Sequence, residues 1–97
     1  MNLRFTPQAL ADIAEIADFI RAESPQAADK VRASILESLR NLALFPRAGR
    51  PQSVEGARKL VTRKYRYLVY YLADDAQDEV VILSVQHGAR ERPFVDN

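Results

Sequence analysis

The chain has no cysteine and a single histidine among its 97 residues. Without cysteine it can form neither a disulfide nor a thiolate metal site, and one histidine leaves only carboxylates as further zinc ligands. We therefore expect no metal and no cofactor. No apolar run approaches the roughly 18 residues of a membrane helix, and residues 1–6 lack the apolar core of a signal peptide. These absences predict a cytoplasmic protein that does not contact a membrane.

Charge is nearly balanced over the whole chain but not along it. The net charge is +1, which is too small for a protein that binds DNA mainly by releasing counterions. Between residues 47 and 66, however, the only acid is Glu55. The basic residues of this segment are Arg47, Arg50, Arg58, Lys59, Arg63, Lys64 and Arg66. This distribution predicts one positively charged face that attracts an acidic peptide or a nucleic-acid backbone.

Proline and hydroxyl residues mark where two helices begin and end. Thr6 before Pro7 and Ser24 before Pro25 each place a capping hydroxyl ahead of a proline at the first helical position. Pro46 ends the second helix, because proline disfavours helical geometry in the residue before it. β-branched and aromatic residues then predict three strands after a loop over residues 47–56. The expected elements are a strand over residues 2–5, helices over about 7–22 and 25–45, strands over about 58–63, 65–73 and 80–87, and a C-terminal tail over 88–97.

These elements predict an α+β fold in a single domain over residues 1–97. The short link between the helices favours a helical hairpin, and the short turns between the last three strands favour antiparallel pairs. The result is a two-layer β-α-α-β-β-β arrangement with the hairpin packed on one face of an antiparallel sheet. In the middle strand Tyr65, Tyr67, Val69 and Tyr71 share one face, and Arg66, Leu68, Tyr70 and Leu72 share the other. One face meets the helices, and the other must be covered or used.

Apolar residues on the helices divide into two sets. The stripes expected to be buried are Leu10, Ile13, Ala14, Ala17 and Ile20 in the first helix and Ala28, Val31, Ile35, Leu39 and Leu42 in the second. The residues that fall off these stripes are the acidic Asp12, Glu15 and Asp18 and the apolar Ile16, Phe19, Leu36 and Ala43. Exposed apolar residues beside a basic sheet predict a partner protein that docks an amphipathic helix or strand carrying acidic residues.

The last predicted strand ends on His87, and Arg90 follows it. Guanidinium groups bind phosphate and carboxylate oxygens in pairs, and histidine exchanges protons near neutral pH. His87 and Arg90, which face the sheet that carries most of the other arginines, are therefore where phosphate chemistry or an acidic partner is to be sought. His87 and the arginines of the sheet also have a structural interpretation, because a strand-end histidine is more often hydrogen-bonded than catalytic, and basic strand residues also solvate a sheet face or prevent edge pairing.

Four short motifs follow one another in the second half of the chain. They are FPRAGR at residues 45–50, RKLV at 58–61, YRYLVYY at 65–71 and VVILSVQHGAR at 80–90. With the order of the predicted elements, they make nearly the whole chain resemble the RelE/ParE superfamily, the toxins of bacterial type II toxin–antitoxin modules. The resemblance implies a toxin that arrests growth and takes no small-molecule ligand. It also implies a cognate antitoxin that neutralises the toxin by wrapping a mostly disordered segment around it.

RelE-like members of the superfamily cleave mRNA in the ribosome. For this branch the resemblance implies that Arg66 and Arg90 stabilise the phosphate and that His87 transfers a proton. Lys59 and Lys64 are loose counterparts of lysines that assist some of these nucleases. The nuclease branch often places a tyrosine in the tail, where this chain has Phe94, which carries no hydroxyl.

ParE-like members instead inhibit DNA gyrase and are not enzymes in their own right. The HGAR ending at residues 87–90, the SPQA helix start at 24–27 and the missing tail tyrosine look closer to this branch. We therefore expect a ParE-like gyrase inhibitor, with the ribosome-dependent nuclease as the alternative and a non-toxic partner-binding remnant as the second alternative. The residues expected to contact the target or the antitoxin are Arg58, Arg63, Tyr67, Ile16, Phe19 and Phe94.

Overall fold

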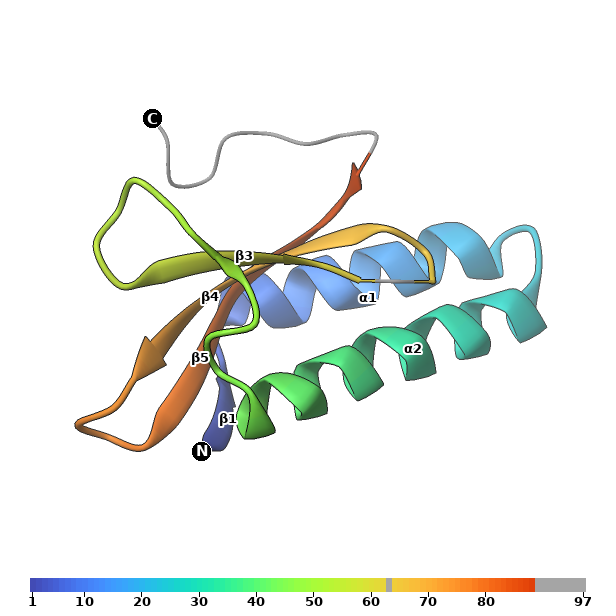
Figure 1. Ribbon diagram of the computed structural model, residues 1–97. Helices are drawn as coiled ribbons and strands as arrows, with labels where there is room; N and C mark the ends of the chain where they lie inside the picture. Colours follow the sequence, from blue (N-terminus) through green and yellow to red (C-terminus); the bar gives the residue numbers. More distant parts are fainter. Residues whose placement is uncertain (63, 89–97) are drawn as a thin grey trace.

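In the computed structural model, which describes residues 1–62 and 64–88, two helices lie on one side of a five-stranded sheet (Figure 1). The strands are β1 (Asn2–Phe5), β2 (Arg50–Pro51), β3 (Ala57–Val61), β4 (Tyr67–Asp74) and β5 (Glu79–His87), and the helices are α1 (Pro7–Arg21) and α2 (Pro25–Leu44). The strand order is β1-β5-β4-β3-β2. The predicted α+β fold, a helical hairpin packed on a sheet, is confirmed.

Side-chain caps begin both helices where the sequence predicts them. Thr6 Oγ1 accepts a hydrogen bond from the N–H of Ala9 at 3.0 Å, and Ser24 Oγ accepts one from the N–H of Ala27 at 3.2 Å. Each such cap contributes about 1 kcal/mol. The hydroxyl of Thr6 also donates to the carbonyl oxygen of Leu83 at 3.0 Å, which fixes the start of α1 against β5. Neither helix of the described chain is both long and apolar enough to cross a membrane.

Two features of the sheet differ from the prediction. β1 lies parallel to β5, with Asn2 opposite Glu79, so the sheet is mixed rather than antiparallel. Because β1 and β5 are far apart in the sequence, no short turn dictates their relative direction. The loop predicted over residues 47–56 contains the two-residue strand β2. Its Pro51 lies at the edge of the sheet, where the missing N–H of proline leaves no gap in the ladder.

The side of the sheet that faces the helices carries the main core. Tyr67, Val69 and Tyr71 of β4 belong to this core, whereas Leu68 and Tyr70 belong to a smaller cluster with Ala57, Leu72 and Leu83. The predicted division of the middle strand into two faces is therefore confirmed for these residues. The buried members of the main core are Ala9, Ile13, Val31, Ile35, Leu39, Leu42, Tyr67, Val69, Tyr71, Val80, Ile82 and Val85.

Helix α1 is rotated about its axis relative to the stripe predicted for it. Leu10, expected in the core, is 56% exposed, whereas Asp12, expected in solvent, is only 9% exposed. Ile16, expected to contact a partner, is half-buried and packs against the main core. Phe19 is 65% exposed, as the pattern predicts. The buried side of α1 therefore combines apolar residues with one carboxylate, a combination that apolar periodicity alone does not reveal.

Candidate functional site

The start of β4 and the end of β5 lie together at one end of the sheet, because the two strands are antiparallel and Tyr67 pairs with His87. We call this region the exit site and define it as Lys64, Tyr65, Arg66, Tyr67, His87 and Gly88. Arg66 and His87, two of the three residues that the resemblance assigns to nuclease chemistry, are thus brought together. The third, Arg90, lies outside the described residues, as do Arg63 and Phe94 of the expected contact residues.

Arg66 holds an unusual backbone conformation in the exit site. Its φ is +54°, in the left-handed region that costs most residues roughly 1–2 kcal/mol. The N–H of Gly88 donates a hydrogen bond to the carbonyl oxygen of Arg66 at 3.1 Å. A Cβ at position 88 would lie 2.7 Å from the same oxygen, so the approach requires glycine. The strand ends thus fix the backbone of Arg66, whose side chain is exposed.

Aromatic rings support the polar groups of the exit site. The rings of His87 and Tyr67 meet edge to face, with centroids 5.3 Å apart and an interplanar angle of 87°. Lys64 Nζ lies 5.7 Å from the centroid of the Tyr65 ring, within cation–π range. Burial, with a smaller effect of Tyr65, raises the pKa of the Tyr67 hydroxyl above its ordinary value of 10.0. That hydroxyl is therefore protonated near neutral pH and cannot serve as a general base.

Tyr67 is not the surface contact residue that the sequence suggests. Only 4% of its surface is exposed, and it belongs to the main core, where its ring packs edge to face against the ring of His87. Among residues 1–62 and 64–88, no three histidine, cysteine, aspartate or glutamate side chains are grouped so that they could hold a metal ion. The described exit site therefore offers exposed cationic groups that can bind anions and one imidazole.

Arg58, another expected contact residue, holds a loop of its own chain. Its Nη1 donates to the carbonyl oxygen of Gly49 at 2.7 Å and to that of Arg47 at 3.4 Å. The neighbouring hydroxyl of Tyr71 donates to the carbonyl oxygen of Pro46 and accepts from the N–H of Gly49, both at 2.8 Å. Burial raises the pKa of Tyr71, an effect that these neighbours partly offset. Arg58 and Tyr71 thus fasten the loop before β2 to the sheet.

The described basic residues between residues 47 and 66 lie in two regions instead of the single face that the sequence predicts. Arg47 forms an ion pair with Asp75 at 2.9 Å. Asp75 follows the last residue of β4, whereas the exit site lies at the first residue of that strand. At about 3.3 Å per residue, the eight residues of β4 separate these ends by about 23 Å. Arg50 and Lys59 face each other across β2 and β3. The positive charge is thus divided between the loop around β2 and the exit site.

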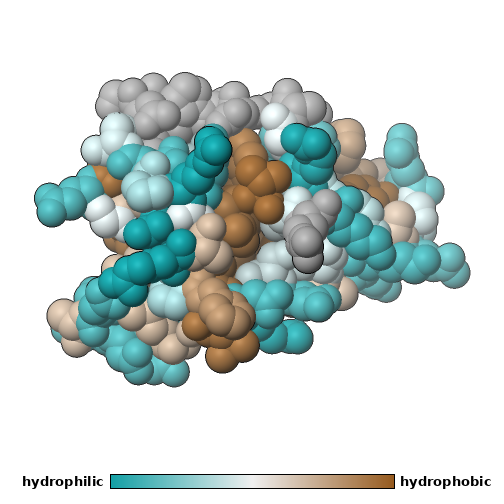
Figure 2. All heavy atoms as spheres, viewed as in Figure 1, coloured by the Kyte–Doolittle hydropathy of each residue, from teal (hydrophilic) through white to brown (hydrophobic). Residues whose placement is uncertain are grey.

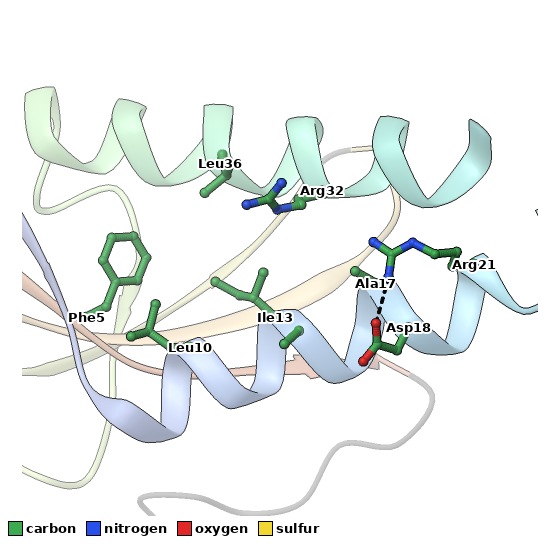
Figure 3. A pocket seen from close by; sticks show the side chains of 9 residues that line it. Phe5, Leu10, Ile13, Ala17, Asp18, Arg21, Arg32 and Leu36 are labelled. Carbon is green, nitrogen blue, oxygen red and sulfur yellow. Dashed lines mark hydrogen bonds and ion pairs between the residues drawn. The ribbon is translucent and has the colours of Figure 1, made fainter. Parts of the chain in front are cut away.

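A second candidate site is a groove of about 390 Å³ between α1 and α2. Figure 3 shows Leu36 and Arg32 reaching into it from α2, opposite Leu10 and Ile13 of α1. Its lining comprises Phe5, Leu10, Ile13, Ala14, Ala17, Asp18, Arg21, Arg32 and Leu36. Asp18 and Arg21 neutralise each other at 2.7 Å. Arg32, by contrast, forms no ion pair within the described part of the chain.

Apolar side chains also reach the surface outside this groove. Besides Leu10 in the groove, the exposed large hydrophobic residues of the described chain are Phe19, Leu44, Phe45, Val54 and Val61. Figure 2 shows a band of hydrophobic residues down the middle of one face, with hydrophilic residues on both sides. Apolar surface of this kind is typical of a protein that binds another protein.

Comparison with known proteins identifies the family. Residues 3–92 match the family described as the ParE toxin of the type II toxin–antitoxin system parDE. The chain belongs to this family. The ParE-family chain is 33% identical over 94 residues to Y4kP, a toxin candidate from Sinorhizobium fredii, covering 97% of this chain and 95% of that one. It is 34% identical over 86 residues to toxin RelE2 of Caulobacter vibrioides, covering 89% and 93% of the two chains.

A solved structure shows the same likeness. The chromosomal ParDE system of P. aeruginosa contains a chain that superposes on this ParE-family member with a TM-score of 0.76 at 28% identity, covering 90% of this chain and 95% of that chain. These comparisons confirm the resemblance to the RelE/ParE superfamily of type II toxins.

Some residues of the two sites escape sequence analysis. Leu10 fits the core stripe of α1, although it lies at the groove, and Gly88 is simply a turn residue when its neighbour across the sheet is unknown. The groove has a partial signal in Leu36, which falls off the stripe of α2. Arg32 has none, because an exposed arginine on a helix is ordinary until a groove lies beside it.

Proposed function

We propose that this chain is a ParE-like toxin that inhibits DNA gyrase and that a cognate antitoxin neutralises it. The observation that carries the proposal is the make-up of the exit site. It offers exposed cationic groups, Arg66 and Lys64, whereas its described residues include a single imidazole, that of His87, and a Tyr67 hydroxyl that stays protonated near neutral pH. Such a site suits binding better than cleavage, which needs an acid and a base together. The match to the ParE family over residues 3–92 supports the same reading.

The test is to express the chain without its antitoxin and determine which damage comes first. A gyrase inhibitor should trap cleaved DNA on the purified enzyme and induce the DNA-damage response while translation continues. In Arg66→Ala this inhibition should fall at least about tenfold, as for other central contact residues. Early mRNA cleavage without a DNA-damage response would contradict the gyrase proposal.

The alternative function is that of a ribosome-dependent mRNA nuclease, which would make the chain an enzyme. The observation that favours it is the pairing of Tyr67 with His87, which places the imidazole close to the start of β4 and thus to Arg66. A cation beside a proton-transfer group supplies two of the parts that phosphodiester cleavage needs. In this case His87→Gln should abolish mRNA cutting on the ribosome, whereas a gyrase inhibitor should tolerate the change better. A chain with neither activity is the non-toxic remnant.

For the antitoxin, we propose that an amphipathic helix docks in the groove between α1 and α2. The groove is lined mainly by apolar residues, and Leu10 is exposed there, so a partner would remove apolar surface from water. Arg32 lacks an ionic partner within the described chain and would pair with an acidic residue of the incoming helix.

Arg32→Glu tests this docking mode. Reversing the charge should weaken the affinity for the antitoxin at least about tenfold, because like charges across an interface repel. Arg40→Glu is the matched control, since Arg40 is exposed on the same helix but does not line the groove. Equal affinities for the two variants, measured by calorimetry, would contradict docking in the groove.

A further inference from the structure

Asp12 is a buried charged side chain between α1 and β5, with 9% of its surface exposed. Its Oδ1 accepts a hydrogen bond from Gln8 Nε2 at 2.7 Å. Its Oδ2 accepts two more, from Ser84 Oγ at 2.8 Å and from the N–H of Val85 at 3.0 Å. None of these donors is charged, and Asp12 forms no ion pair within residues 1–62 and 64–88. Because burying a carboxylate without a cation is costly, packing alone would be served better by an apolar side chain.

The two β5 donors lie at an irregularity in the sheet. The register pairs Tyr71 with Ile82 but the preceding Tyr70 with Ser84. Leu83 is therefore an extra residue in β5, which makes this a β-bulge. A bulge disrupts the hydrogen-bond ladder around the extra residue. Ser84 and Val85, the two residues that follow Leu83, both donate hydrogen bonds to Asp12 of α1.

The bulge determines how the end of β5 meets the start of β4. If the register that pairs Tyr71 with Ile82 continued without the bulge, Tyr67 would lie opposite Gln86 instead of His87. A shift of one residue turns each following side chain to the opposite face of the sheet. The contact between the His87 and Tyr67 rings would then be lost, and so would the hydrogen bond from Gly88 to Arg66.

We propose that Asp12 is a positioning residue that holds β5 in its bulged register and thereby sets the geometry of His87 and Arg66 in the exit site. Asp12 acts through Ser84 and Val85 and does not touch the target. The inference on register rests on the contacts of Asp12 alone. Its consequence for toxicity rests on the proposed function.

NMR spectroscopy of Asp12→Asn tests the register. The amide has nearly the same volume, but its one oxygen carries no full charge, so the two hydrogen bonds that Ser84 and Val85 make to a single carboxylate oxygen become weaker. Its N–H group also competes for the place in which Gln8 Nε2 now donates to the carboxylate. We expect the nuclear Overhauser contacts between the rings of His87 and Tyr67 to disappear. We also expect hydrogen exchange at Val85 to accelerate at least about tenfold, which corresponds to about 1.4 kcal/mol of opening free energy. Asp18→Asn, on the same helix but exposed, should change neither.

Growth arrest gives the second measurement. Asp12→Asn should arrest growth at least about tenfold less than the parent chain, while its affinity for the antitoxin at the groove stays within about twofold, because Asp12 bonds to β5 and does not line the groove. If the parent chain proves non-toxic, the proposed function fails, but the NMR contacts between the rings of His87 and Tyr67 still test the role of Asp12 in the register.

Ser84→Ala covers the possibility that Asp12→Asn does not fold. It removes one donor and leaves the carboxylate bonded to Val85, so we expect faster exchange at Val85 and weaker ring contacts without unfolding. Unchanged ring contacts and exchange in a folded Asp12→Asn would overturn the proposal. The same result in Ser84→Ala would overturn it if Asp12→Asn is unfolded.

Discussion

The groove and the exit site are built from different kinds of interaction. The groove is formed by side chains from β1, α1 and α2, and Leu10 lies exposed at it. The exit site depends on backbone geometry, namely the left-handed Arg66 and the hydrogen bond from Gly88. Apolar contact is non-directional and tolerates small changes of shape, whereas the exit site requires one strand register. Substitutions in the groove should therefore affect antitoxin binding, and substitutions that disturb the exit site should affect toxicity.

Arg66→Gly should separate the two sites most clearly. Glycine adopts a φ of +54° without the strain that other residues carry there, which offsets its larger entropy cost on folding. The free energy of unfolding in urea should therefore stay within about 1 kcal/mol of the parent value. Growth arrest should fall at least about tenfold, because the guanidinium is gone.

Asp78→Gly is the matched control for this change. Asp78 has a φ of +53°, but it lies in the turn before β5, at the opposite end of the sheet. Its replacement should relieve the same backbone strain and leave growth arrest unchanged. Full toxicity of a stable Arg66→Gly chain would show that the strained arginine has no role in function.

Gly88→Ala should disturb the exit site through its backbone. The added Cβ would lie 2.7 Å from the carbonyl oxygen of Arg66, so the strand ends must move apart at a cost of about 1–3 kcal/mol. We expect lower growth arrest and an affinity for the antitoxin that stays within about twofold of the parent value. Gly56→Ala is the control, because Gly56 has a φ of +82° but lies outside both sites. Equal effects of the two alanines on growth arrest would mean that stability alone, not the exit site, controls toxicity.

The groove should respond to a change of polarity rather than of shape. Leu10 is 56% exposed, and a partner helix would bury its side chain. Leu10→Asp places a charge there and should weaken the free energy of antitoxin binding by about 1.5–3 kcal/mol. Stability and growth arrest should hardly change. Val54→Asp is the control, because Val54 is an exposed apolar residue that does not line the groove. An antitoxin that binds both variants as tightly as the parent chain docks elsewhere.

The two sites also differ in how far sequence analysis predicts them. Local signals located the helix caps at Thr6 and Ser24 and the two faces of β4, because neighbouring residues decide these features. The inward turn of Arg58 depends on carbonyl groups of a loop that local patterns cannot place. Asp12 bonds to residues more than 70 positions away, so helical periodicity assigned it to solvent.

Sequence analysis singled out two residues of the exit site but not its geometry. His87 and Arg66 stood out as a histidine at a strand end and an arginine in a basic segment. The left-handed backbone of Arg66 and the extra residue Leu83 left no signal, because both result from pairing between β4 and β5. Residue types thus pointed to these two side chains, and the register of the sheet determined how they are arranged.

The smallest expected effect is a loss of stability at alkaline pH that is caused by Tyr67 and Tyr71, the two buried tyrosines of the main core. Burial raises the pKa of both Tyr67 and Tyr71 above 10.0 in the folded chain. As the pH rises through about 10, the unfolded chain releases these protons first, so it binds fewer protons than the folded chain and folding becomes less favourable. The stabilising contribution is therefore complete below pH 10 and is lost above it. Urea unfolding between pH 8 and pH 11 should show this decline.

Phenylalanine substitutions at Tyr67 and Tyr71 test which hydroxyl causes the loss of stability above pH 10. Tyr67→Phe keeps the ring beneath His87, so it should reduce the decline above pH 10 and preserve growth arrest. Tyr71→Phe should also reduce the decline, but it should lower stability at pH 7 by about 1–3 kcal/mol, because the N–H of Gly49 and the carbonyl oxygen of Pro46 lose their partner. If both variants lose stability above pH 10 as steeply as the parent chain, other groups cause the decline, and the core tyrosines do not couple folding to pH.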